Sequence, residues 1–230
     1  MREPDGPHPR GLIVAIDGPS GAGKSTAGRA LAERLNYVFL DTGAMYRALA
    51  LAALRSGLAA DDEVGLARLA SGLKLGLERD GTVLLAGEDV TAAVRSREVT
   101  LAASRVAAQP EVRRQMVALQ REMGKQGGVV LDGRDIGTAV FPNAEVKFFL
   151  DADPARRALR RHAELAASGT ASDPAAIERE LRERDRADST RADSPLVRAP
   201  DAILLDTTLL GPEEVVERML ATVEAKAATA

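Results

Sequence analysis

Residues 18 to 26 read Gly-Pro-Ser-Gly-Ala-Gly-Lys-Ser-Thr, so that one glycine is followed by four residues and then by Gly-Lys-Ser. This spacing is typical of a phosphate-binding loop (P-loop), whose successive backbone N–H groups point into one concavity sized for a phosphate. The glycines allow the tight turn that such a concavity needs. We therefore predict that nine consecutive residues bind the phosphates of a nucleoside triphosphate: Gly18, Pro19, Ser20, Gly21, Ala22, Gly23, Lys24, Ser25 and Thr26.

The segments that flank the P-loop occur in the order that this motif requires. Residues 12–17 form an apolar run of strand length, and residues 24–35 are rich in alanine and leucine and favour a helix. A helix that begins there adds the positive end of its dipole to the anion site. We expect Lys24 to reach the outer phosphates as a catalytic residue, and the Ser25 hydroxyl to ligate the Mg²⁺ that bridges them.

The composition narrows the class of protein. The chain has no cysteine, which excludes disulfides and thiolate metal sites and suits a reducing cytoplasm, and its two histidines cannot build a histidine-rich metal site. A net charge of −3 argues against a general nucleic-acid binder. The longest apolar run, residues 48–54, is too short to cross a membrane. We expect a cytoplasmic monomer whose residues 1–10, rich in proline and charge, form a disordered tail and no signal peptide.

Strand-like and helix-like patterns alternate along the rest of the chain. This alternation predicts an α/β fold with an open, five-stranded parallel sheet flanked by helices, and a single domain over residues 11–230. In such sheets ligands bind at the carboxyl ends of the strands. Asp17, Asp41, Asp132 and Asp206 end four of the expected strands, which are residues 12–17, 37–40, 128–132, 145–150 and 202–206.

The pattern of hydrophobic residues changes after residue 70. Leucines alternate with other residues over 73–77, Asp80-Gly81 is suited to a hairpin turn, and residues 83–85 form a second apolar run. A further turn at residues 87–89 is consistent with a third short strand. We interpret this antiparallel element, within residues 63–108, as an insertion into the parallel sheet.

The segment between the fourth and fifth expected strands has the highest density of arginine in the chain. Arg157, Arg160 and Arg161 share one helix face because they are three or four residues apart. A solvated helix with ion pairs is one interpretation, and Glu178 with Arg182 fits it. For the first three arginines we favour a catalytic role facing phosphates, because Glu164 is their only obvious acidic neighbour.

Two further arginines follow strand ends and indicate the kind of acceptor. Arg47 and Arg134 can each make two parallel hydrogen bonds to a phosphate, which suits an acceptor that is itself a phosphate monoester. Such an acceptor is already ionised at neutral pH, so that catalysis reduces to aligning two anions and neutralising the charge of the transferring group. The alternative is that each arginine forms a structural ion pair with a neighbouring aspartate.

Six segments closely resemble bacterial cytidylate kinases, which are nucleoside monophosphate (NMP) kinases. They occur in the order of that family, and the resemblance runs from about Leu12 to the end of the last helix. It implies a P-loop NMP kinase fold with an NMP-binding insertion at 63–108 and a mobile lid at 153–190. It also implies transfer of the γ-phosphoryl group of Mg-ATP to CMP or dCMP. The segments are residues 18–26, 40–47, 102–108, 132–137, 141–144 and 184–191.

The same resemblance assigns the acceptor site. A carboxylate can accept a hydrogen bond from the N4 amino group of cytosine, whereas uracil presents an acceptor at that position. The segment from Arg184 to Arg191 is less regular than the pattern of the family. By resemblance, Arg47 and Arg134 hold the phosphate of CMP, Thr42 and Tyr46 border the nucleotide, Ser104, Arg113 and Asp135 read the cytosine, Asp188 and Arg191 contact the sugar, and Arg184 completes the site.

Two other functions are compatible with a P-loop. A kinase for UMP or for a metabolite alcohol is the first, and an alcohol acceptor would need a base such as Asp17 or Asp41. The second is a nucleotide-dependent switch without enzymatic activity. The chain has no Asn-Lys-x-Asp motif for reading guanine, which disfavours the switch.

Overall fold

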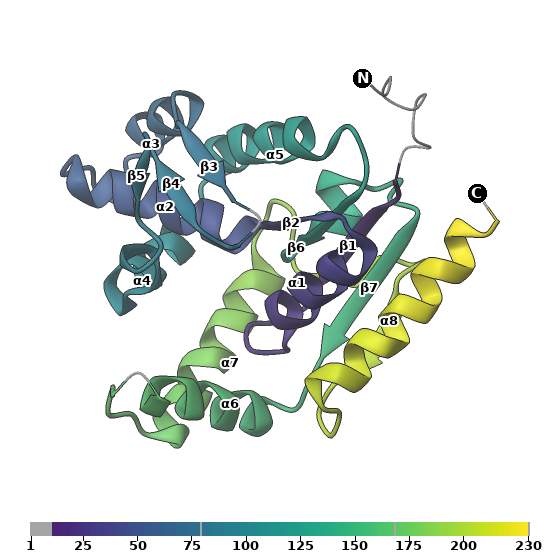
Figure 1. Ribbon diagram of the computed structural model, residues 1–230. Coiled ribbons are helices and arrows are strands. Elements are labelled where there is room, and N and C mark those ends of the chain that lie inside the picture. Colours follow the sequence, from purple (N-terminus) through teal and green to yellow (C-terminus); the bar gives the residue numbers. More distant parts are fainter. Residues whose placement is uncertain (1–10, 79, 168, 230) are drawn as a thin grey trace.

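The computed structural model describes residues 11–78, 80–167 and 169–229, so that the predicted tail at residues 1–10 lies outside the described residues. At its centre is a parallel sheet of five strands in the order β2-β6-β1-β7-β8 (Figure 1). The predicted fold class is confirmed. The strands are β1 (Ile13–Asp17), β2 (Val38–Asp41), β6 (Val129–Asp132), β7 (Val146–Asp151) and β8 (Ile203–Asp206).

Side chains of the central strand alternate between the two faces of the sheet, and different helices cover each face. Val14 and Ile16 of β1 pack with residues of α1 (Lys24–Leu35) and α8 (Pro212–Ala227) in one hydrophobic cluster. Figure 1 shows these two helices side by side on one face of the sheet. Ala15 faces the opposite side. That side is covered by α5 (Pro110–Gly124) and by η2 (Ile136–Val140), a single π-helical turn.

All five strands end in aspartate at the same edge of the sheet. The sequence indicated four of these residues, and the fifth is Asp151, which lies one residue beyond the predicted end of its strand. Neighbouring strands are in register at this edge, with Asp41 opposite Asp132 and Asp151 opposite Asp206. The P-loop leaves this edge from β1, the middle strand, so that carboxylates surround it on both sides.

A second hydrophobic cluster lies beside the sheet. Met45, Leu49, Leu66 and Met116 are fully buried in it. The predicted antiparallel element is confirmed, including its third strand. The second turn lies at Ala86 and Gly87, with positive φ angles of 51° and 87°, and residues 88–89, which were predicted to belong to the turn, form the third strand instead. The remaining elements of this region are α2 (Thr42–Arg55), α3 (Glu63–Ser71), β3 (Leu75–Leu77), β4 (Val83–Leu85), β5 (Glu88–Asp89), η1 (Ala93–Arg95) and α4 (Arg97–Val106).

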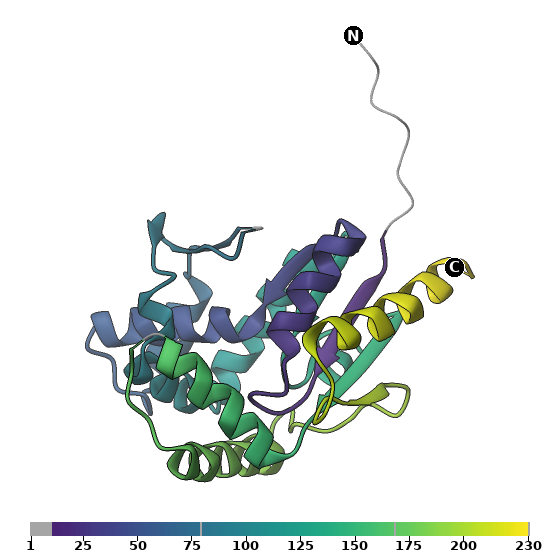
Figure 2. The same cartoon turned by 60° about the horizontal axis from the view of Figure 1, so that its bottom comes forward.

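Two helices of the arginine-rich segment pack together near the carboxyl edge of the sheet. They are α6 (Pro154–Ala167) and α7 (Pro174–Thr190), and Ala158, Ile177 and Leu181 form their shared hydrophobic contact. Figure 2 shows this pair beside the loop that precedes α1. No helix among the described residues is both long enough and apolar enough to span a membrane.

Candidate active site

The P-loop has the backbone conformation that its glycines were expected to supply. Gly18, Gly21 and Gly23 have φ angles of 143°, 78° and 91°, which side chains other than hydrogen rarely permit. Gly23 is the N-cap of α1 and no side chain caps this helix, so that its first backbone N–H groups are available to an anion. The buried Lys24 donates from Nζ to the Pro19 carbonyl oxygen at 2.7 Å. The loop thus has the shape of a phosphate cradle.

Replacing Gly18 with alanine is expected to destabilise the fold by about 2–5 kcal/mol, from backbone strain and overpacking together. The added Cβ would lie 1.9 Å from the carbonyl oxygen of Leu150 on β7. Urea unfolding measures this cost. Gly211→Ala is the matched control, because its added Cβ would meet no atom within 4 Å and the residue has an ordinary φ of −72°. Equal stability of the two variants would show that the close contact is not structural.

Three carboxylates surround the P-loop. Ser25 Oγ donates to Asp132 Oδ2 at 2.5 Å, while Asp132 Oδ1 is buried and has no hydrogen-bond partner in the described part of the chain. Burial raises the pKa of Asp132, and the nearby charge of Asp41 raises it further. Burial also raises the pKa of Asp17 to about 6, although both of its oxygens accept from the backbone N–H groups of η2. A hydroxyl and a carboxylate therefore lie side by side at the start of α1.

Positive charges converge on the same place. Burial lowers the pKa of Lys24, and the neighbouring charges of Arg134 and Arg184 lower it further. Burial likewise lowers the pKa of Arg184 to about 10, with Arg134 and Arg47 adding to the shift. The Nε–H groups of Arg184 and Arg47 are buried and have no hydrogen-bond partner within the described residues. Buried cations that repel one another and keep unused donors form a site for anions.

The two arginines that were expected to bind the acceptor phosphate also contact carboxylates. Arg47 Nη2 lies 3.2 Å from Asp41 Oδ2, and Arg134 Nε donates to Asp188 Oδ2 at 2.8 Å. Each guanidinium is about one-fifth exposed. Both ion pairs are therefore at the surface of the site, and neither uses all five N–H groups of its arginine.

A group of buried polar side chains around Asp135 connects this cation cluster to α5. Asp135 forms a short ion pair with Arg113, whose guanidinium carbon also lies 5.7 Å from the centre of the Tyr46 ring. Arg191 Nη2 is 3.6 Å from the other oxygen of Asp135, and Arg191 Nη1 is 3.9 Å from Asp188. Burial raises the pKa of Tyr46 to about 12. The Tyr46 hydroxyl and Arg113 Nε are buried without a hydrogen-bond partner among the described residues, so that this group too has unused polar atoms.

The three arginines of α6 do not share one environment, and each contacts a different partner. Arg157 contacts the carbonyl side of the P-loop, donating to Ser20 O at 3.0 Å. Arg160 donates to both the hydroxyl and the carbonyl oxygen of Thr207, which follows β8. Arg161 is exposed and pairs with Glu164, the acidic neighbour that its sequence offered. The three side chains thus have different protein partners, and their expected role facing phosphates stays a prediction.

Two other predicted residues, Thr42 and Ser104, lie on α2 and α4. Thr42 is buried at the start of α2 and donates to the carbonyl oxygen of Asp132 at 2.5 Å. Ser104 lies half-buried on α4. Sequence reasoning missed Asp185, which pairs with Arg157 at 2.6 Å, and Thr207, which donates to the carbonyl oxygen of Ala22 at 3.0 Å. The only signal for Thr207 was its position directly after a strand that ends in aspartate.

A phosphate cradle at the carboxyl edge of a parallel sheet, opposite a second group of cations with unused donors, defines a P-loop kinase. The family model for cytidylate kinases matches residues 14–225, and the chain belongs to this family. It is 57% identical to a cytidylate kinase of Syntrophotalea carbinolica over 92% of this chain and 91% of that protein. It is 50% identical to a cytidylate kinase of Geobacter sp. strain M21, with 95% of each chain covered.

Comparison with solved structures supports the fold alone. A gluconokinase from Sinorhizobium meliloti 1021 aligns with a TM-score of 0.50 at 17% identity, covering 96% of this chain and 95% of that chain. Such low identity shows a shared architecture and says nothing about the acceptor. The family membership and the geometry of the site carry the functional argument.

Proposed function

We propose that this kinase transfers the γ-phosphoryl group of ATP to CMP or dCMP and produces CDP or dCDP. The observation that carries the proposal is the cluster of Lys24, Arg47, Arg134 and Arg184, which includes buried N–H donors without partners among the described residues. Two anionic nucleotides bound face to face would supply the missing negative charge. Membership of the cytidylate kinase family supports cytidine nucleotides as the acceptors.

The proposed mechanism is one of alignment and charge neutralisation. The P-loop N–H groups and Lys24 hold the phosphates of ATP, and Arg47 and Arg134 hold the phosphate of CMP. At Arg134 we propose that the acceptor phosphate takes the place of Asp188, an exchange that keeps the guanidinium paired with an anion. Because the acceptor oxygen is already ionised, the transfer needs no general base.

Mg²⁺ fits the residues at the start of α1. Magnesium prefers oxygen ligands and is usually held by one or two protein side chains together with substrate phosphates. Ser25 Oγ and Asp132 Oδ1, which has no hydrogen-bond partner in the described part of the chain, are suitable oxygens, and we propose that they hold the ion directly or through water. When bound, Mg²⁺ neutralises charge on the phosphates of ATP.

The buried group around Asp135 is suited to reading the base. Its carboxylate can accept a hydrogen bond from the N4 amino group of cytosine, while the N–H groups of Arg113 can donate hydrogen bonds to acceptor atoms of the ring. Arg113 Nε and the Tyr46 hydroxyl are polar atoms that a bound nucleotide could satisfy. We place Ser104 beside the base and Arg191 beside the sugar, as the family resemblance implies.

An alcohol acceptor is not favoured by the structure. Both oxygens of Asp17 are committed to the backbone N–H groups of Ile136 and Gly137, at 2.7 and 2.8 Å. Asp41 caps α2 by accepting from Ala44 N, and it also pairs with Arg47. Each of these carboxylates thus already has structural contacts at both oxygens, which disfavours it as the base for an alcohol.

The proposed function is tested by one panel of acceptors with ATP as donor, in the presence of Mg²⁺. Release of ADP is measured with CMP, dCMP, UMP, dTMP, AMP and GMP. We expect CMP and dCMP to be phosphorylated most efficiently. Absence of turnover with both cytidine nucleotides would refute the proposal, whatever happens with the others.

Replacing Asp135 with asparagine is expected to reduce the preference for CMP over UMP by about 10-fold or more, because one base-reading contact is worth about 1–3 kcal/mol. The ratio of the two kcat/KM values is the readout, since loss of the ion pair with Arg113 also affects stability and absolute rate. Asp80→Asn, in the exposed hairpin, is the control. An unchanged ratio in the Asp135 variant contradicts the base-reading role.

We also propose that residues 63–108 bind the monophosphate and that residues 153–190 act as a lid, in a monomeric cytoplasmic enzyme. A closed site would exclude water from the transferring phosphoryl group. Limited proteolysis tests the lid: a bisubstrate analogue is expected to slow cleavage within residues 153–190. The same cleavage rate with and without the analogue would argue against closure.

A further inference from the structure

Arg157 holds the P-loop from its carbonyl side. The guanidinium donates from Nη1 to Ser20 O at 3.0 Å and from Nε to Ala152 O at 2.8 Å, and the residue is only 3% exposed. The C=O and N–H groups of a trans peptide point in opposite directions. Fixing the Ser20 carbonyl toward Arg157 therefore directs the next N–H, that of Gly21, away from Arg157 and toward the phosphate cradle.

Two other carbonyl oxygens of the loop are held in a similar way. Pro19 O accepts from Lys24 Nζ, and Ala22 O accepts from Thr207 Oγ1. The first contact is made within the P-loop, and the second comes from the carboxyl edge of the sheet. The contact from Arg157 differs because it comes from α6, which packs against α7 and thus connects the donor loop to another part of the site.

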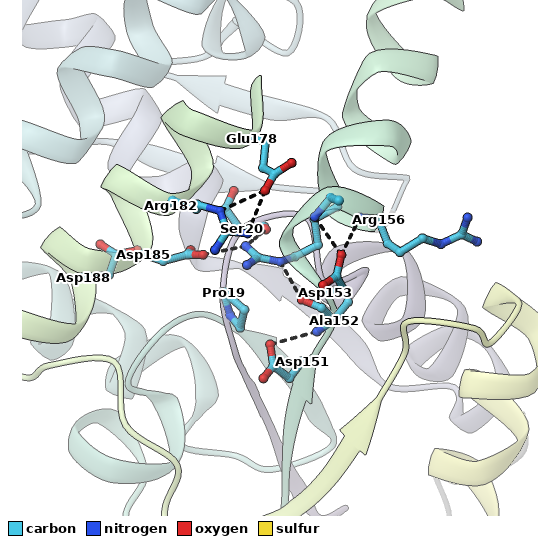
Figure 3. A network of polar contacts seen from close by, with 12 residues as sticks. Pro19, Ser20, Asp151, Ala152, Asp153, Arg156, Glu178, Arg182, Asp185 and Asp188 are labelled. Atoms are coloured by element: carbon cyan, nitrogen blue, oxygen red, sulfur yellow. Dashed lines mark hydrogen bonds and ion pairs between the residues drawn. The ribbon is translucent and has the colours of Figure 1, made fainter. Parts of the chain in front are cut away.

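Asp185 on α7 is the ionic partner of Arg157. Its Oδ2 accepts from Arg157 Nη1 at 2.6 Å, while its Oδ1 is buried and has no hydrogen-bond partner among the described residues. Figure 3 shows Asp185 directed toward Ser20 and Ala152, with Asp188 further along the same helix. Movement of α7 would therefore change the position of Arg157 and, through it, that of the Ser20 carbonyl.

The other end of this connection lies in the proposed acceptor site. Asp188 is almost one helical turn beyond Asp185 and accepts from Arg134 Nε at 2.8 Å. Burial favours a raised pKa for Asp188, but the charges of Arg134 and Arg184 outweigh this effect and hold its pKa below the ordinary value. A phosphate that takes Arg134 away from Asp188 would alter the forces on α7.

We propose that the ion pair between Arg157 and Asp185 is a positioning bridge that couples binding of the acceptor nucleotide to the geometry of the donor loop. The inference rests on the proposed function and adds residues to it. Arg157 is then a positioning residue that acts through the Ser20 carbonyl, in place of the phosphate-facing role expected from sequence. Acceptor binding shifts α7, and Asp185 transmits the shift to Arg157.

The test measures coupling between the two sites in the full-length protein. The dissociation constant of a non-hydrolysable ATP analogue is determined with and without saturating CMP, and the ratio of the two constants is the coupling factor. We expect a factor of about 5 or more in the unmodified protein, within the usual range for coupled sites. Asp185→Asn is expected to reduce this factor to about 2 or less, while the affinity for CMP alone changes by less than about threefold.

Glu178→Gln is the matched control because it removes an ion pair on the same helix, between the half-buried Glu178 and the exposed Arg182 at 2.7 Å. It is expected to keep the coupling factor of the unmodified protein. Arg157→Lys is expected to lose coupling as Asp185→Asn does, and the double variant is expected to lose no more, as for two residues of one unit. Thermal unfolding confirms that each variant is folded.

Several results would overturn the bridge. They are unchanged coupling in Asp185→Asn, equal loss in the Glu178→Gln control, and absence of coupling in the unmodified protein. Loss of analogue binding in Arg157→Lys alone, with Asp185→Asn unaffected, would instead show a direct contact with phosphate. Failure of the proposed function is a separate result, seen as no turnover with CMP or dCMP. In that case coupling is measured with the monophosphate that the acceptor panel identifies.

Discussion

Lys24→Met is expected to lower kcat by about 10²- to 10³-fold, the cost of removing one preorganised charge from a site of this kind. Lys24 is buried at the start of α1, and its ammonium group donates to the Pro19 carbonyl oxygen of the P-loop, where we propose that the phosphates bind. Methionine has a similar length and no charge, so that it removes the electrostatic stabilisation and leaves the packing almost unchanged. The rate is measured with saturating ATP and CMP. A kcat within tenfold of the unmodified enzyme would show that Lys24 is not catalytic.

The same variant has a second expected property. Burial and the charges of Arg134 and Arg184 lower the pKa of Lys24 below its ordinary value of 10.5. Between the lowered pKa and 10.5 the unfolded chain binds more protons at this position, so this group makes stability rise with pH across that window. Lys24→Met removes the contribution. Urea unfolding at about pH 7 and about pH 9 is therefore expected to show a smaller increase in stability in the variant. An equal increase in both proteins would contradict the stated cause of the pKa shift.

Sequence reasoning located the elements that depend on local patterns. The helix at Lys24–Leu35 has the predicted bounds because a glycine loop starts it and Asn36, with a φ of 55°, ends it. Helix α2 begins at Thr42, two residues before the apolar pattern of its sequence, because Asp41 caps it by accepting from Ala44 N at 2.7 Å. A cap of this kind extends the start of a helix by a few residues, and hydrophobic periodicity alone does not reveal these residues.

The partners of the arginines were not predictable in this way. Helical spacing placed Arg157, Arg160 and Arg161 on one face, but their environments are set by groups distant in sequence. Arg157 contacts Ser20, 137 residues away, and Arg160 contacts Thr207, 47 residues away. Only tertiary packing brings these groups together. The sequence therefore predicted a cation-rich region but could not predict where each arginine side chain points. The ion pair of Arg134 with Asp188, 54 residues away, has the same origin, whereas Arg47 pairs with Asp41 only six residues away. The sequence had offered such pairs as an alternative.

These pairs explain how one site can hold two anions and still fold without them. Four mutually repelling cations lie close together at the sheet edge, and Asp41, Asp132 and Asp188 compensate part of their charge. This compensation is incomplete, because several N–H groups of the arginines remain without partners in the described part of the chain. Substrate phosphates would therefore replace carboxylates at Arg47 and Arg134, which makes binding an exchange of partners.

Arg134→Lys is expected to lower kcat/KM for CMP by about 10²-fold or more, while KM for ATP changes by less than about threefold. A lysine keeps the charge but cannot make the two parallel hydrogen bonds that align a phosphate for in-line transfer. If Arg134 only served as a structural partner of Asp188, a lysine at this position could still pair with that carboxylate and the acceptor kinetics would be preserved.

Steady-state kinetics with each substrate varied in turn distinguish these cases. Arg218→Lys is the matched control, because Arg218 lies on α8 in an exposed pair with Glu214 and its charge is likewise retained. We expect the control to behave as the unmodified enzyme. If Arg134→Lys raised KM for ATP and CMP equally, the loss would reflect general disturbance of the cation cluster. Selective loss toward CMP would place the guanidinium of Arg134 on the acceptor phosphate, because only a direct contact distinguishes a fork of five donors from a single ammonium group.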